Sequence, residues 1–276
     1  MNRSIPFPSP APSPFRPYPP PLSLLVPRAE ESIALSPTPE QLPILYVIVV
    51  YTVVIFALWN IPGARLLITP LKLFTIGWHE LCHIALAIFT GGSVEKVSID
   101  PDAGGATVVV GGHAPTILVA GYLGSTVFGG VFVLAGFDTL VAKILSFVLG
   151  VGLVAPLSLV RNKLTIVLTI FYEGLLIGFW FIDHAQPLRW YCLFVGIMNI
   201  FYAVWDITDD KYFRKVNDSD ASQLALRYSF IGAHVWAVLW ILFEIGVLIG
   251  FVFLGLVSFK LTTEQMATEA AKFLPT

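Results

Sequence analysis

Long apolar runs constrain this chain more than any other feature. The first of them reads ILYVIVVYTVVIFALWNI. A run of about 20 apolar residues is long enough to cross the hydrocarbon core of a bilayer as one helix. Comparable runs recur along the sequence and predict an all-α polytopic membrane protein with about seven transmembrane helices. They lie at about 44–61, 66–90, 115–137, 139–160, 163–183, 189–207 and 229–258.

Composition agrees with this fold class. Only 12% of the residues are charged, whereas soluble domains carry roughly 25%. The formal net charge is −2 and no basic block is present, which argues against nucleic acid as a partner. Cys82 and Cys192 both fall in apolar runs, so a disulfide framework is not expected. This composition is typical of a protein embedded in the lipid bilayer.

The polar stretches divide the chain into three parts. Residues 1–42 contain twelve prolines, and such a segment favours an extended, disordered tail because proline lacks a backbone donor. Residues 43–258 form the predicted transmembrane domain, and residues 259–276 form a short polar C-terminal tail. The tail at the N-terminus is expected to lie in the cytosol.

Between the second and third apolar runs lies SVEKVSIDPDAGGATVVVGG. Its alternating apolar residues and central Asp-Pro-Asp-Ala-Gly-Gly turn predict a β-hairpin at about 93–111. An open hairpin has unpaired backbone groups at its edges, so it cannot face lipid. The hairpin is therefore expected at the membrane interface or against a protein surface that lines a cavity.

Lysine and arginine in the loops predict the orientation. The side that holds the N-terminal tail carries ten of these residues and the opposite side six. Cytosolic loops are enriched in both residue types, so the N-terminus is expected in the cytosol. In a eukaryotic cell an endomembrane is the expected location.

The second apolar run contains the sequence HELCH, from His79 to His83. Residues four apart share one face of a helix, so the two imidazoles can bind one cation together. Glu80 lies beside them and can reach a water molecule at that cation, as in zinc hydrolases. In the alternative interpretation, the histidines only hydrogen-bond neighbouring helices. An ionisable side chain buried in a membrane, such as Glu80, favours a functional site.

A hydrolytic zinc site needs a third protein ligand. The sixth run ends in NIFYAVWDITDD, where Asp206 follows Asn199 by seven residues. Seven residues are nearly two helical turns, so we expect both side chains on one face of one helix. The second and sixth runs end on the same side of the membrane, which brings Asp206 within reach. Asp209 and Asp210 are the alternative ligands.

These residues resemble the site-2 protease family of intramembrane zinc metallopeptidases. The resemblance rests on HELCH in an early helix, a hairpin after it, the glycine-rich stretch VAGYLGSTVFGG and the late Asn-to-Asp pattern. It covers about residues 66–215 and is closest to the compact B-like branch without a PDZ domain. The stretch NIFYAVWDITDD lacks the proline and the Asp-Gly pair of the motif that is commoner in that family.

The resemblance implies a zinc metalloprotease that hydrolyses membrane-anchored protein substrates. In that reading His79, His83 and Asp206 ligate zinc, Glu80 activates water, and Asn199 binds the substrate backbone. Two other functions remain open from the residues alone. One is a catalytically inactive scaffold, or pseudoprotease, that binds transmembrane helices. The other is a transporter or channel with the buried histidines and glutamates on an ion path.

Overall fold

The computed structural model describes residues 36–100, 104–160, 162–212 and 218–275, without the side chains of residues 211 and 212. Residues 1–35, which hold most of the predicted proline-rich tail, lie outside the described residues. All that follows concerns the unit formed by residues 37–276.

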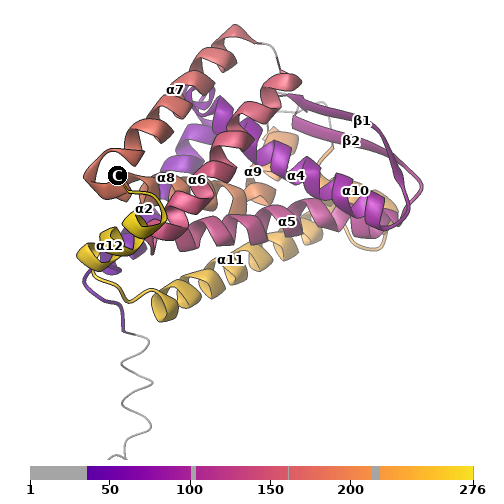
Figure 1. The fold of residues 1–276 in the computed structure, drawn as a ribbon. Coiled ribbons are helices and arrows are strands. Elements are labelled where there is room, and N and C mark those ends of the chain that lie inside the picture. Colours follow the sequence, from indigo (N-terminus) through magenta and orange to yellow (C-terminus); the bar gives the residue numbers. More distant parts are fainter. Residues whose placement is uncertain (1–35, 101–103, 161, 213–217, 276) are drawn as a thin grey trace, which may run out of the picture. The chain divides into compact units, whose positions relative to one another are not determined.

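Helices dominate the described residues, as the apolar runs predicted (Figure 1). Six of the described helices are long and apolar enough to span a membrane, and a seventh span results if a pair that meets at 53° is counted as one. The expectation of an all-α polytopic protein with about seven transmembrane helices is confirmed. The six are α2 (Leu42–Asn60), α4 (Thr69–Phe89), α5 (Ala114–Ala135), α6 (Thr139–Val154) with the 3-10 turn η2 (Ala155–Ser158), α7 (Lys163–Trp180) and α11 (Ala233–Ser258).

The bent pair consists of α8 (Gln186–Ile200) and α9 (Tyr202–Tyr212). One continuous helix over this stretch was expected, and that expectation is wrong. The backbone N–H of Ala203 in the first turn of α9 donates to Glu244 Oε1 at 2.7 Å. Glu244 is fully buried in α11, so its carboxyl satisfies a donor that the break would leave unpaired within the bundle. Because of the bend, Asn199 and Asp206 do not share one helix face.

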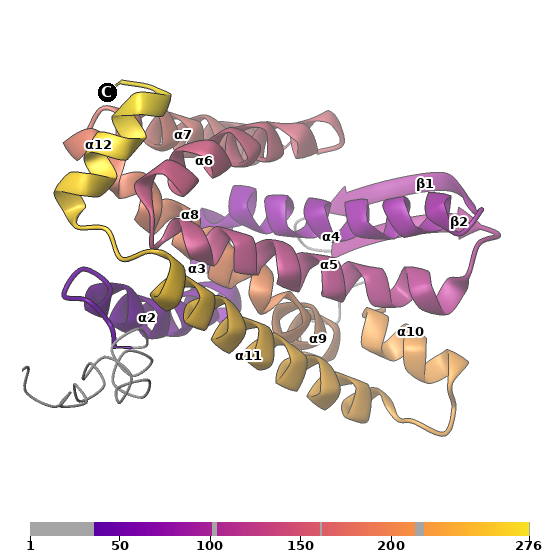
Figure 2. The ribbon, with the colours of Figure 1, turned by 60° about the horizontal axis from the view of Figure 1, so that its bottom comes forward.

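The predicted hairpin is present. It consists of β1 (Ser93–Asp100) and β2 (Gly104–Val110), which pair in antiparallel register with Ser98 opposite Ala106. Both strands lie along α4 (Figure 2). Gly111 and Gly112 follow β2 with φ of +77° and +71°, which glycine adopts without strain. They turn the chain into α5, which runs beside α4.

Helices α4, α5 and α8 form the centre of the bundle (Figure 2). A Cβ on Gly129 of α5 would overlap the backbone of α8 at Ile200, and one on Gly196 of α8 would overlap α5 at Val133. Small residues on both helices thus permit close backbone contact, as is common in membrane bundles. This contact holds α5 in place beside the HELCH turn.

Four short helices complete the described fold: α3 (Ala64–Leu67), η3 (Asp183–Ala185), α10 (Asp220–Arg227) and α12 (Thr263–Phe273). The segment expected as a polar C-terminal tail thus contains a helix. Buried Lys143 of α6 donates through Nζ to the carbonyl oxygens of Ala270 and Leu274, at 3.2 and 2.7 Å. The end of α12 therefore supplies acceptors to an ammonium group inside the bundle.

Candidate metal centre

The HELCH turn faces the inside of the bundle. His79 and His83 are both buried, and their Nε2 atoms lie 2.9 Å apart. The spacing of four residues places both rings on one face of α4, as predicted. Gly121 of α5 lies opposite, and a Cβ there would overlap both imidazole rings. Glycine at this position therefore provides the space that the histidine pair occupies.

Neighbouring groups hold both rings in place. His83 Nδ1 lies 2.7 Å from the carbonyl oxygen of Ile117, which can only accept, so Nδ1 carries a proton and Nε2 is the ring nitrogen that faces the site. The His79 ring packs against those of Tyr202 and Tyr122, with centroids 4.5 and 5.3 Å apart. Both Nε2 atoms are thus directed at one point.

A third donor at that point comes from α10. Asp220 Oδ2 lies 3.2 Å from His79 Nε2 and 3.3 Å from His83 Nε2. Two donors bound to one zinc at about 2.0–2.1 Å lie about 3.3 Å apart in tetrahedral geometry. The three atoms form a triangle with edges of 2.9, 3.2 and 3.3 Å. Two imidazoles and a carboxylate in this arrangement fit a zinc ion with one position open for water.

The charge state of Asp220 agrees with a ligand role. Burial raises the pKa of its carboxyl, but the neighbouring His83 and His79 more than offset this and hold the pKa below its ordinary value. The carboxylate is therefore ionised at neutral pH, as a metal ligand must be.

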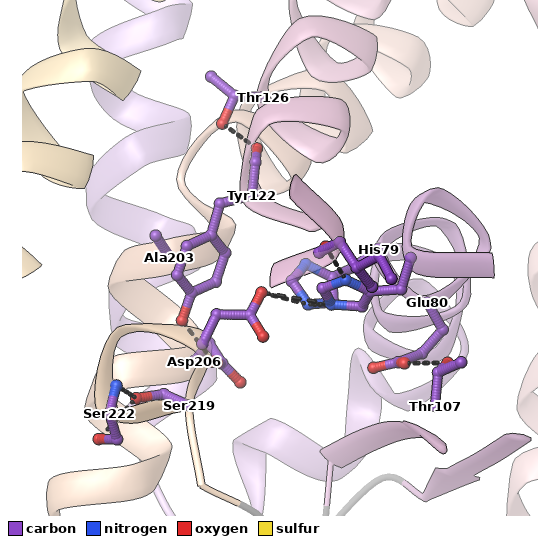
Figure 3. A network of polar contacts seen from close by, with 12 residues as sticks. His79, Glu80, Thr107, Tyr122, Thr126, Ala203, Asp206, Ser219 and Ser222 are labelled. Carbon is purple, nitrogen blue, oxygen red and sulfur yellow. Dashed lines mark hydrogen bonds and ion pairs between the residues drawn. The ribbon is translucent and has the colours of Figure 1, made fainter. Parts of the chain in front are cut away.

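Asp210 and the N-cap of α10 hold Asp220 in place. Ser219 caps the helix, since its Oγ accepts from the backbone N–H of Ser222. Asp210 Oδ2 on α9 accepts from the backbone N–H of Ser219 at 3.2 Å and from Ser222 Oγ at 2.8 Å. Figure 3 shows Ser219 and Ser222 beside the site. Ser219 and Ser222, one residue before and two residues after Asp220, are therefore tied to α9.

The other acidic residues of α9 point to different partners. Asp206 lines the same pocket as the histidines, and its Oδ2 accepts a hydrogen bond of 2.6 Å from the Tyr122 hydroxyl (Figure 3). Asp209 Oδ2 accepts from Trp59 Nε1 at 3.1 Å and lies 3.6 Å from Lys72 Nζ. Among these candidates, the structure brings Asp206 to the pocket and directs Asp209 towards the start of α4.

Asn199 is fully buried near the end of α8. Its Nδ2 donates to the carbonyl oxygen of Val195 at 2.9 Å. It does not line the pocket among the described residues, so its proposed contact with substrate stays a prediction.

Glu80 lies at the edge of the histidine pair and faces the hairpin. Its Oε2 accepts a hydrogen bond of 2.6 Å from Thr107 Oγ1 of β2 (Figure 3). A Cβ on Gly105 would overlap the carboxylate, so glycine there leaves room for Glu80. The ligand atoms of His79, Glu80 and His83 all lie within 4.8 Å of one another. The geometry suits a base beside the metal position.

A polar pocket of about 410 Å³ contains these groups. Three aspartates line it together with Thr107 and the two histidines and the glutamate of HELCH: Asp206, Asp218 and Asp220. Carboxylates and imidazoles at its wall make it a suitable space for water, which a hydrolytic reaction consumes.

The sequence interpretation did not identify Asp220, Tyr122 or Thr107. A serine followed by an acidic residue is the pattern of a helix start, so the sequence SDA at residues 219–221 could have placed α10. It could not have placed that helix against HELCH. Thr107 lies in a strand that was predicted, but the register that turns it towards Glu80 is set by packing on α4.

Comparison with known proteins agrees with the resemblance noted in the sequence. A family model described as Peptidase M50B-like matches residues 48–251. No curated protein and no solved structure matches the chain. The matched region includes the HELCH turn, the hairpin, α9 and α10.

Proposed function

Because this chain belongs to the Peptidase M50B-like family, we propose that it is an intramembrane zinc endopeptidase that cuts membrane-anchored proteins. The observation that carries the proposal is the triangle of His79 Nε2, His83 Nε2 and Asp220 Oδ2, with Glu80 beside it. The family and the apolar helices make the chain a multi-pass membrane protein. Its N-terminus is proposed to lie in the cytosol.

Asp220 is proposed as the third protein ligand. The sequence had pointed to Asp206, but the distances of Asp220 to both imidazoles support Asp220 better. Asp206 instead accepts from Tyr122, whose ring packs against His79. Asp206 therefore acts through Tyr122 on the orientation of His79, and it remains the alternative ligand.

When bound, zinc supplies Lewis acidity that acidifies water and polarises the scissile carbonyl. Glu80 takes a proton from the water as its oxygen bonds to the carbonyl carbon, and passes that proton to the amide nitrogen as the C–N bond breaks. Thr107 donates to Oε2 and so holds the carboxylate of Glu80 in place. The imidazoles and Asp220 hold the metal position, and the polar pocket supplies the water.

The test combines metal analysis with a base variant. Purified protein in detergent should contain about one zinc per chain, and Glu80→Gln should retain that zinc. Loss of a general base costs about 10²–10⁴-fold in rate, and cleavage of a lysine-flanked Leu/Ala membrane-spanning peptide should fall accordingly. Protein without stoichiometric metal, or equal cleavage by Glu80→Gln, would contradict the proposal. Bound zinc with no Glu80-dependent cleavage would favour the inactive scaffold.

A further inference from the structure

A second cavity shares Glu80 with the polar pocket as a lining residue. It is an apolar cleft of about 600 Å³ between α4, β1 and the end of α6 with η2. Helix α4 contacts both β1 and α6 (Figure 2), and residues of all three elements line the cleft. The side chains that define it are Trp78, Leu81, Val97, Ile99, Val151 and Leu159.

Glu80 lines both cavities. Among the described residues around the apolar cleft, it is the one ionisable side chain. The polar pocket, in contrast, carries three aspartates in addition to the two histidines. The candidate base therefore stands at the boundary between a polar space and an apolar space.

The walls of the cleft are open towards the outside of the bundle. Val151 is 74% exposed, Phe147 53% and Leu81 48%, and they belong to membrane-spanning helices. Such residues face hydrocarbon rather than water, so an occupant reaches the cleft sideways through the bilayer. At the base of the cleft, a Cβ on Gly77 would lie 3.5 Å from Ile99 and 3.8 Å from Pro156. Glycine at this point keeps the gap between β1 and η2 open.

Resting on the proposed function, we propose that this cleft binds the apolar side chains of the substrate's membrane-spanning segment next to the scissile bond. The scissile peptide must reach Glu80 and the imidazoles, and its neighbours in a membrane segment are apolar. Placing those neighbours in the polar pocket would desolvate Asp206, Asp218 and Asp220 and displace water. The apolar cleft accepts them without that cost, so water and substrate approach Glu80 through different cavities.

The resulting specificity is for an apolar side chain beside the cleaved bond. A lipid acyl chain is the competing occupant, because it is also apolar and arrives through the bilayer. Only a peptide occupant brings an amide bond to Glu80. Cross-linking from the cleft wall distinguishes the two occupants, because it yields either a peptide adduct or a lipid adduct.

The test measures where the peptide binds and needs no cleavage, so it uses the Glu80→Gln variant. Benzoylphenylalanine replaces Val151 in the cleft or, as a control, Val167 of α7, which is 62% exposed and outside the described cavities. Both proteins are irradiated in lipid nanodiscs with the Leu/Ala membrane-spanning peptide. We expect a peptide adduct from position 151 at least fivefold above that from position 167. Equal yields, or lipid adducts alone at position 151, would overturn the proposal.

A steric variant tests the same cleft by cleavage. Val151→Trp should lower peptide cleavage about tenfold or more while zinc content stays at the level of the unsubstituted chain. Val167→Trp should leave cleavage within twofold. Unchanged cleavage by Val151→Trp would contradict substrate binding in the cleft. Absence of zinc from the unsubstituted protein would instead contradict the proposed metalloprotease function. The two failures are therefore distinguishable.

Discussion

The two halves of the metal centre are built in different ways. Helix α4 supplies His79, Glu80 and His83 from just over one helical turn, so helical periodicity places the three residues next to one another. The acidic half comes from α9 and α10, where neighbouring carboxylates have different partners. A local motif is thus fixed by its helix, whereas the choice among nearby acids is made by contacts with other elements.

The largest expected effect is in the α4 half. His83→Ala removes one corner of the donor triangle, and zinc affinity should fall by more than the 10–100-fold that loss of an outer partner costs. Zinc content after dialysis against a graded chelator measures this change. Retention of stoichiometric zinc would mean that the imidazoles are not ligands.

The acidic half is examined by comparing Asp220→Ala with Asp206→Ala. We expect about 100-fold weaker zinc binding for Asp220→Ala, which removes a ligand, and about tenfold weaker binding for Asp206→Ala, because Asp206 acts through Tyr122. Chelator titration of both variants gives the ranking. The reverse order would assign Asp206 as the ligand and Asp220 as its support.

Gly105→Ala separates the base from the ligands. Its Cβ would occupy the space of the Glu80 carboxylate, so peptide cleavage should fall about tenfold or more as general base catalysis weakens. Zinc content should not change, because no donor is lost. Gly174→Ala is the matched control, since a Cβ there meets nothing within 4 Å. Loss of zinc in Gly105→Ala would instead place Glu80 among the ligands.

Asp210 ties the residues beside Asp220 to α9. Asp210→Ala frees Ser219 and Ser222, and zinc affinity should fall about tenfold, the lower end for a supporting residue. Asp210→Asn keeps an acceptor oxygen and should restore most of the affinity. If both variants bind zinc like the unsubstituted chain, the cap of α10 is sufficient by itself.

The smallest effect is expected far from the metal, at the bend between α8 and α9. Glu244→Leu leaves the buried N–H of Ala203 without its acceptor, which costs about 1–3 kcal/mol. Glu244→Gln retains an acceptor and should recover most of that stability. Thermal unfolding in one detergent compares the two. Equal melting temperatures for the Glu244→Leu and Glu244→Gln variants would show that the hydrogen bond to Ala203 does not stabilise α9.

Much of the fold follows from the sequence because its signals are short-range. The apolar runs gave the membrane helices, and the alternating residues around the Asp-Pro-Asp-Ala-Gly-Gly turn gave the hairpin. The break at Phe201 had no such signal, because the acceptor that stabilises it is Glu244 of α11. The same holds for Thr107, which reaches Glu80 only once β2 packs on α4.

By itself, then, the sequence determined that this is a polytopic membrane protein with two histidines on one helix face and a glutamate next to the first of them. Helical periodicity is enough for that conclusion. The tertiary structure decided that Asp220, rather than an acidic neighbour on α9, contacts both imidazoles. It also decided that Glu80 lines both a polar pocket and an apolar cleft. Both depend on how distant helices pack, and packing is set by the complementary surfaces of many residues rather than by the spacing of a few.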